Sequence, residues 1–185
     1  MHNIPNLISL VRLLLVPLTV WLILSEAYVS AFVTFLVAGI SDGIDGYLAR
    51  RFDWRTRLGS YLDPLADKTL VVSVFVTLGF LKLIPAWLVI TVVSRDVLII
   101  GAVLLSRLMD HPIRVTPLMV SKVNTVAQIV FLVAVLGFAA AKLPLSAIVD
   151  YGSIPVALLT ALSGAAYLSA WFRHMAEQPH EDHRP

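Results

Sequence analysis

Six apolar runs divide the chain, and short polar breaks separate them. Each run is long enough to cross roughly 30 Å of hydrocarbon as a helix. The runs are Leu7–Leu24, Val29–Tyr47, Ser60–Leu81, Pro85–Leu105, Leu118–Ala141 and Ile148–Phe172. We therefore predict an all-α integral membrane protein with six transmembrane helices. It would form one domain over residues 1–176, with a polar tail over residues 177–185.

The composition agrees with this prediction. Of 185 residues, 58% are hydrophobic and 14% are charged, which is rare in a soluble domain. The net charge of +2 is too small to argue for nucleic acid as a partner, and the lack of cysteine excludes disulfides and thiolate chemistry. The first residues lack the basic stretch and cleavage site of a signal peptide, so we expect the first run to be a retained span.

Positive charges are distributed unevenly between the two ends of the predicted spans. Six spans would place both termini and the second and fourth connections on one side. That side holds Arg50, Arg51, Arg55, Arg57, Arg107, Arg114, Arg173 and Arg184. The opposite side holds Lys82 and Lys142. Because basic connections remain in the cytoplasm, we expect both termini to face the cytoplasm, in the inner membrane of a bacterium.

Four aspartates lie in or beside the second and third runs, although an ionised carboxylate is costly in a bilayer. Asp42 and Asp45 are three residues apart, and Asp63 and Asp67 are four apart, so each pair lies on one helical face. Two neighbouring helices could aim all four carboxylates into one cleft at their cytoplasmic ends. Such oxygen-rich clusters suit hard cations such as Mg²⁺ or Mn²⁺. The alternative is that the aspartates are loop residues or pair with nearby arginines.

Pro64 lies between Asp63 and Asp67, and proline is readily accommodated only in the first turn of a helix. The third helix must then begin close to Gly59 or kink at the proline. We favour the early start, because a kink would disturb the spatial relation between the two aspartates.

The ordered pattern of these residues is more specific than any pair of them. It reads Asp42-x-x-Asp45-Gly46-x-x-Ala49-Arg50, then eight residues, then Gly59-x-x-x-Asp63-x-x-x-Asp67. This pattern resembles the signature of the CDP-alcohol phosphatidyltransferase family, and every signature position is matched. The resemblance implies a homodimeric, six-helix membrane enzyme with two divalent cations. Its donor would be CDP-diacylglycerol and its by-product CMP.

The resemblance also implies roles for single residues. The metal ligands would be Asp42, Asp45, Asp63 and Asp67. Contacts to the cytidine diphosphate part would come from Asp42, Gly46, Ala49, Arg50 and Gly59. Asp67 resembles the family's proposed general base, so Asp67 and Asp63 are the candidate catalytic residues. Displacing CMP builds negative charge that two cations can neutralise, so the residue types fit the reaction.

The second half of the chain is expected to recognise the acceptor. Arg95 and Lys122 are predicted to be buried, where they could bind an acceptor phosphate, and Arg107 and Arg114 lie between them. Two alternatives remain open. Arg95 could instead pair with Asp96 or with an aspartate of the cluster, and Lys122 could snorkel to the surface.

Within the family, the chain is most similar to the cardiolipin synthases that use CDP-diacylglycerol and phosphatidylglycerol. The similarity rests on Leu62–Lys68, Ser94–Val97 and Ser121–Thr125. The sibling phosphatidylglycerophosphate synthases, which use glycerol 3-phosphate, usually carry a second lysine at Asn124 and a glutamate at Asp96. A singly charged phosphodiester needs fewer cations than glycerol 3-phosphate does. Asn124, which we predict to be an acceptor-binding residue together with Arg95, Arg107, Arg114, Lys122 and Arg12, therefore favours phosphatidylglycerol as the acceptor.

Arg12 lies inside the first apolar run. It would either contact a donor or acceptor phosphate or snorkel to the cytoplasmic interface. A competing function for the whole chain is divalent cation transport, in which acidic residues are spread through the membrane depth. The four aspartates crowd instead at one end of two adjacent runs, which favours the enzyme.

Overall fold

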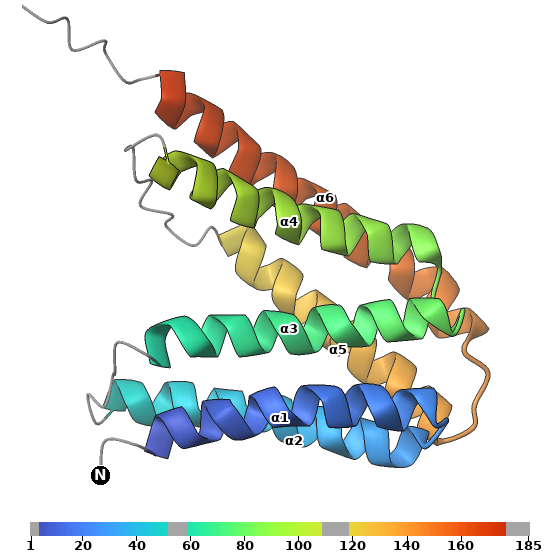
Figure 1. The fold of residues 1–185 in the computed structure, drawn as a ribbon. Coiled ribbons are helices and arrows are strands. Elements are labelled where there is room, and N and C mark those ends of the chain that lie inside the picture. The colour runs from blue at the N-terminus through green and yellow to red at the C-terminus, as the bar shows by residue number, and fades with distance from the viewer. Residues whose placement is uncertain (1–3, 52–58, 109–118, 177–185) are drawn as a thin grey trace, which may run out of the picture.

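The structure is a computed structural model that describes residues 4–51, 59–108 and 119–176, with side chains within 11–41, 68–102, 105 and 119–171. The described residues form six helices (Figure 1). These are α1 (Ile4–Leu24), α2 (Tyr28–Arg51), α3 (Gly59–Phe80), α4 (Ala86–Leu108), α5 (Met119–Ala140) and α6 (Ser146–Ala176). The all-α prediction is confirmed, and each helix lies within a few residues of a predicted run, apart from longer ends on α2 and α6.

The helices alternate in direction along the chain, as successive crossings of one layer require. Figure 1 shows the N-terminal ends of α1, α3 and α5 at its left-hand side, together with the C-terminal ends of α2, α4 and α6. α3 begins at Gly59 and continues through Pro64, so the early start is confirmed. The halves of α2 and α3 that carry the four aspartates therefore lie at one end of the molecule. We call this end the aspartate end.

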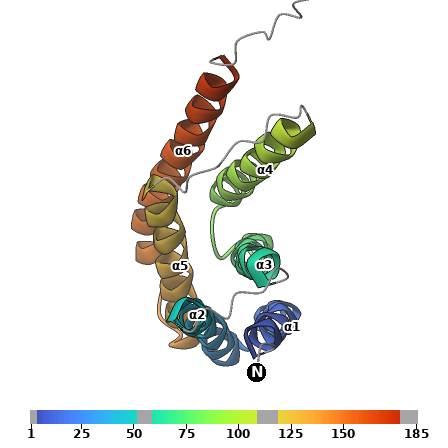
Figure 2. The ribbon, with the colours of Figure 1, turned by 90° about the vertical axis from the view of Figure 1, so that its left-hand side faces the viewer.

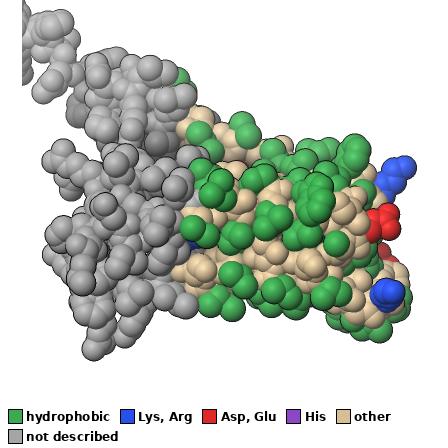
Figure 3. Space-filling view, turned by 60° about the horizontal axis from the view of Figure 1, so that its bottom comes forward, with side chains coloured by type: hydrophobic (Ala, Val, Ile, Leu, Met, Phe, Trp, Pro, Cys, Tyr) green, Lys and Arg blue, Asp and Glu red, His purple; other side chains and the backbone are tan. Residues whose placement is uncertain are grey.

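Three tight connections at the opposite end share one backbone conformation. Glu26, Lys82 and Lys142 have φ angles of 59°, 58° and 56°, in the left-handed region. Each is followed by a residue whose N–H bonds back to the last turn of the preceding helix, the Schellman pattern of helix termination. These bonds join Ala27 to Leu22, Leu83 to Leu78 and Leu143 to Phe138, each at 2.9 Å. Lysine and acidic side chains are visible at this end in Figure 3.

The helices pack in two linked groups, which Figure 2 shows from the aspartate end. α1 packs against α2 and α3, whereas α6 packs against α4 and α5; α2 joins the groups through α5, and α3 through α4. The rings of Phe75 and Phe131 stack between α3 and α5, with their centroids 6.2 Å apart. Gly152 of α6 lies against Phe131, and a Cβ there would meet the ring at 2.9 Å. The absence of a side chain lets α6 approach this core.

The outside of the molecule is apolar over most of its length. Leu14, Ile90 and Leu158 are each 60–65% exposed, and they come from three different helices. Figure 3 shows hydrophobic side chains over the flank of the molecule and charged ones at its right-hand end. Contact of such a continuous apolar surface with water is unfavourable, whereas its contact with lipid chains is favourable.

Two helices pass a stricter test for membrane spans. Within the described residues, Met119–Ala140 and Ser146–Trp171 are long and apolar enough to cross a membrane. The described apolar parts of the first three helices are shorter, at Val11–Leu24, Tyr28–Ser41 and Lys68–Phe80. The structure therefore has six helices, of which α5 and α6 are clear candidate spans. The full count of six spans stays a prediction.

Candidate active site

The backbone brings the two aspartate pairs to one end of the molecule. Asp42 and Asp45 lie in the C-terminal half of α2, and Asp63 and Asp67 lie in the N-terminal half of α3. Their side chains are outside the described part of the structure, so the convergence of the four carboxylates stays a prediction. The same holds for the surroundings of Gly46 and Gly59 and for the side chains of Ala49, Arg50 and Arg107. Arg114 lies outside the described residues altogether.

No metal site is found among the side chains that are described. Within that set, no group of three or more Asp, Glu, His or Cys residues could hold an ion. The four aspartates do not belong to the set, and they remain the candidate ligands.

A pocket of about 160 Å³ lies directly below the aspartate end, between α2, α3, α4 and α5. Its lining residues are Phe35, Gly39, Lys68, Leu70, Val71, Asp96, Thr125, Gln128 and Ile129. Gly39 lies one helical turn from Asp42, and Lys68 directly follows Asp67. The lining combines a charged pair with two polar side chains and several apolar ones. This mixture suits a molecule with a polar head and an apolar body.

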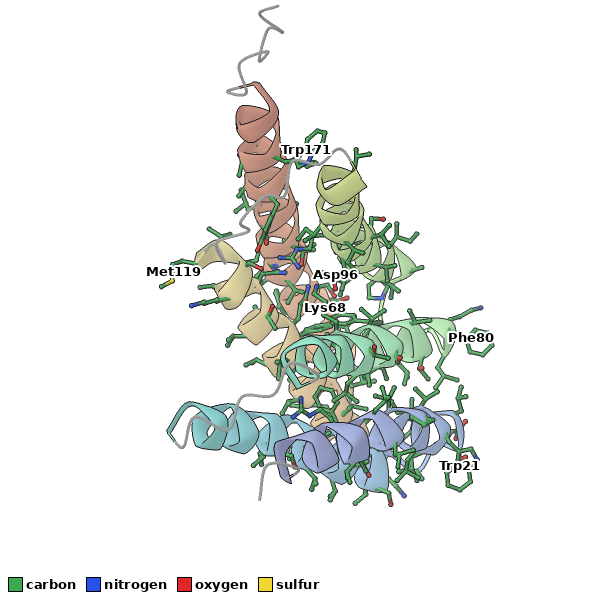
Figure 4. All side chains as sticks on the ribbon, turned by 60° about the vertical axis from the view of Figure 1, so that its left-hand side comes forward. Trp21, Lys68, Phe80, Asp96, Met119 and Trp171 are labelled. Atoms are coloured by element: carbon green, nitrogen blue, oxygen red, sulfur yellow. The ribbon has the colours of Figure 1, made fainter. Side chains whose placement is uncertain are left out.

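Asp96 of α4 is shared by two cations. Its Oδ1 atom accepts hydrogen bonds from Lys68 Nζ at 2.6 Å and from Arg95 Nη1 at 2.7 Å. The side chain of Arg95 is 6% exposed, whereas that of Lys68 is 42% exposed. Figure 4 shows Lys68 reaching from α3 towards Asp96 on α4. The open alternative for Arg95 is thus resolved in part, because its ion pair with Asp96 is confirmed.

Arg95 is also held by the two helices that follow. Its Nη2 atom donates hydrogen bonds to Ser121 Oγ of α5 and to Ser163 Oγ of α6, both at 2.6 Å. The guanidinium carbon lies 5.6 Å from the ring centroid of Tyr167, in cation–π contact. One buried side chain therefore joins α4, α5 and α6, and through Asp96 it also joins α3.

A second polar chain connects α5 to α6 one turn away from Arg95. Thr160 donates a hydrogen bond to Asn124 Oδ1 at 2.8 Å and accepts one from Gln128 Nε2 at 3.2 Å. Asn124 is fully buried, so it faces α6 rather than the outside of the bundle. Its predicted contact with the acceptor remains a prediction.

The structure decides between the alternatives for burial at two positions. Lys122 is exposed, because Asn124, two residues further along α5, occupies the buried face of that helix. Arg12 is 1% exposed, so its side chain does not snorkel to the surface but lies inside the bundle. The roles of Lys122 and Arg12 in binding phosphate stay predictions.

Sequence reasoning did not identify the α6 residues of this region. Thr160, Ser163 and Tyr167 follow a spacing of three and four residues, so they share one helical face. That spacing was the available signal, but small polar residues at such positions are also common in ordinary helix packing within membranes.

A comparison with known protein families identifies the family of this chain. Residues 2–172 match the CDP-alcohol phosphatidyltransferase family. The chain belongs to this family.

Several curated relatives of this phosphatidyltransferase-family protein have names that describe their reactions. The chloroplastic CDP-diacylglycerol--glycerol-3-phosphate 3-phosphatidyltransferase 1 of Oryza sativa subsp. japonica is 38% identical over 72% of this chain and 46% of its own length. The cardiolipin synthase (CMP-forming) of Homo sapiens is 38% identical over 71% of this chain and 49% of its own. The chain spans about half the length of these two relatives.

A bacterial relative is covered more fully. The CDP-diacylglycerol--glycerol-3-phosphate 3-phosphatidyltransferase of Bacillus subtilis is 32% identical over 74% of this chain and 77% of its own length. Relatives named cardiolipin synthase and relatives named glycerol-3-phosphate 3-phosphatidyltransferase are therefore both similar to this chain, and identity alone does not separate the two activities.

The shared Asp96 carboxylate generates the first testable prediction for this phosphatidyltransferase-family protein. Asp96→Asn leaves the buried charge of Arg95 without its counter-ion, and we expect it to lower the free energy of unfolding by about 3 kcal/mol. Lys68→Met removes the other partner, whose side chain is 42% exposed, and should cost less than about 1 kcal/mol. Equilibrium unfolding in mixed micelles measures both. Equal losses of unfolding free energy in the two variants would contradict the assignment of Arg95 as the main partner of Asp96.

Proposed function

We propose that the protein transfers a phosphatidyl group from CDP-diacylglycerol to the hydroxyl group of an acceptor, releasing CMP. The favoured acceptor is phosphatidylglycerol, which gives cardiolipin. One observation carries the proposal. The complete, ordered signature of aspartate, glycine, alanine and arginine positions falls on the two helix halves that meet at the aspartate end. Membership of the family supports the same reaction class.

The residues at this end fit a pair of divalent cations, Mg²⁺ or Mn²⁺. Carboxylates are the hard oxygen ligands that these ions prefer. Asp42 and Asp45 share one face of α2, and Asp63 and Asp67 share one face of α3, and the two helices run antiparallel. These four residues would hold the cations. When bound, the cations would neutralise the negative charge that develops on the pyrophosphate and on the departing CMP.

The chain's own groups would perform the remaining tasks. Asp67 would accept the proton of the attacking hydroxyl group, provided that it is held less tightly than the other aspartates. Arg50 would donate hydrogen bonds to oxygens of the cytidine diphosphate, and Gly46 and Gly59 would leave room for the nucleotide beside the backbone. The bond from phosphorus to CMP breaks as the bond to the acceptor oxygen forms.

Three observations support a lipid as the acceptor. The pocket below the aspartate end has apolar walls as well as the charged Lys68–Asp96 pair. Three N–H bonds of Arg95 are already taken by protein groups, which leaves few donors for a dianionic phosphate. Asn124 provides no positive charge. Glycerol 3-phosphate remains the second candidate, because relatives named for it are as similar as the cardiolipin synthases.

The apolar exterior supports a membrane location. The continuous hydrophobic flank and the candidate spans α5 and α6 suit a bilayer, and the basic connections suit a cytoplasmic aspartate end. Both lipids would enter sideways from the inner leaflet, with the nucleotide at the cytoplasmic surface. A homodimer is the expected assembly.

An acceptor assay on purified protein tests this function directly. We expect CMP release from CDP-diacylglycerol with Mg²⁺ or Mn²⁺ when phosphatidylglycerol is supplied. Asp63→Asn should lower turnover by roughly two orders of magnitude or more while the thermal unfolding midpoint stays near that of the wild type. Asp150→Asn is the matched control, since Asp150 is an exposed carboxylate near the start of α6, away from the aspartate end.

The outcomes separate the parts of the proposal. CMP release with glycerol 3-phosphate alone would overturn the acceptor and leave the reaction standing. Substantial residual activity of Asp63→Asn would argue against the metal site.

Filling the pocket below the aspartate end should weaken the use of lipid. A Cβ on Gly39 would meet no atom within 4 Å, so a leucine there extends into open space rather than into the core. We expect Gly39→Leu to lower kcat/KM for phosphatidylglycerol about tenfold. Gly101→Leu is the matched control, because Gly101 also borders open space but does not line the pocket. Equal activity of the two variants would refute a role of the pocket in lipid binding.

A further inference from the structure

α6 holds the guanidinium group of Arg95 through contacts that the proposed reaction does not explain. The hydroxyl group of Ser163 accepts a hydrogen bond from Nη2, and the ring of Tyr167 lies 5.6 Å from the guanidinium carbon. Ser163 is fully buried, and the side chain of Arg95 is 6% exposed. The contact is therefore shielded from the surroundings, where charge-assisted hydrogen bonds are strong.

The backbone of α6 also lies close to the aliphatic stem of Arg95. A Cβ built on Gly164 would lie 3.4 Å from Arg95 Cγ, which is an ordinary van der Waals contact. The stem thus lies beside α6, while the charged end is held by Ser163 and Tyr167. Rotation of Arg95 to another rotamer would break several of these contacts at once.

The hydrogen bonds of the guanidinium group leave one of its buried donors unsatisfied. Nη1 donates to Asp96, and Nη2 donates to Ser121 and Ser163. The buried Nε–H group has no hydrogen-bond acceptor among the described residues. Leaving a buried donor of a charged group unsatisfied is costly, and an incoming anionic oxygen would remove that cost.

We propose that Ser163 and Tyr167 are positioning residues for acceptor binding. They hold the Arg95 guanidinium in the one orientation that leaves a donor for the acceptor phosphate. α6 thereby sets the affinity for the acceptor without touching it. The inference rests on the proposed function, since it assigns Arg95 to the acceptor rather than to CDP-diacylglycerol.

Kinetics with separate variation of the two substrates test this assignment. Ser163→Ala should raise the KM for phosphatidylglycerol, measured as its mole fraction in mixed micelles, roughly 3- to 10-fold. The KM for CDP-diacylglycerol should stay within twofold of the wild type. Ser163→Thr restores a hydroxyl group at the same position and should recover most of the loss. A residue that only stabilised the fold would not change one KM selectively.

Ser153 provides a matched control on the same helix. It is 1% exposed, and its hydroxyl group has no hydrogen-bond partner among the described residues. Ser153→Ala removes the same atom from an equally buried site, and it should leave both KM values unchanged. Tyr167 provides an independent variant if Ser163→Ala fails to fold. Tyr167→Leu should raise the acceptor KM, whereas Tyr167→Phe keeps the aromatic face and should not.

The same assay distinguishes a failure of the positioning role from a failure of the proposed function. Wild-type CMP release with a normal acceptor KM in Ser163→Ala and in Tyr167→Leu would overturn the positioning role alone. An equal rise in both KM values would also overturn it, because it would indicate a general disturbance of the site. Wild-type protein that releases no CMP with phosphatidylglycerol or glycerol 3-phosphate would overturn the proposed function and this inference together. A selective rise in the acceptor KM, rescued by Ser163→Thr, would establish it.

Discussion

The ion pair between Arg95 and Asp96 is the interaction on which the described structure depends most. A buried charge in an apolar bundle is stable only if its partners compensate for lost hydration. Here the compensation comes from four helices, because Lys68 of α3 shares Asp96 while Ser121 of α5 and Ser163 of α6 bind Arg95. The charge therefore ties α4 to α3, α5 and α6 at one depth. The apolar contacts around it favour compactness, but these polar contacts fix how the helices are oriented.

This arrangement explains how two different kinds of site can adjoin. α2 and α3 carry the carboxylates, and α4, α5 and α6 carry the buried arginine with its partners. The pocket between them is lined by Lys68 and Asp96, so the ion pair forms part of its wall. Ser163 and Tyr167 of α6 contact Arg95 directly, whereas the aspartates lie on α2 and α3. In the proposed function, binding of the acceptor and binding of the metal ions would depend on separate parts of one bundle.

The sequence predicted the helices well because six long apolar runs have few other ways to satisfy their backbone hydrogen bonds. The start of α3 at Gly59 followed from the backbone restriction at Pro64. Partners across helices were harder to predict. The sequence left open whether Lys122 is buried or snorkels to the surface. It is exposed, because Asn124 lies about 200° further around α5 and occupies the buried face. For Arg12 the sequence left snorkelling and a phosphate contact open, and the side chain is buried. Ser163 gave no distinctive signal, because its role depends on which helix faces it. The meeting of the four carboxylates remains a prediction.

The claim that carboxylates of α2 and α3 share one pair of divalent ions is central to the account. Paramagnetic resonance of Mn²⁺ bound to the protein in lipid nanodiscs tests it most directly, without any need for turnover. The account predicts two manganese ions per chain that are close enough for spin–spin coupling, and it predicts that Asp42→Asn on α2 and Asp63→Asn on α3 each abolish the coupling. Isolated, uncoupled ions, or a coupled pair that survives both substitutions, would contradict it.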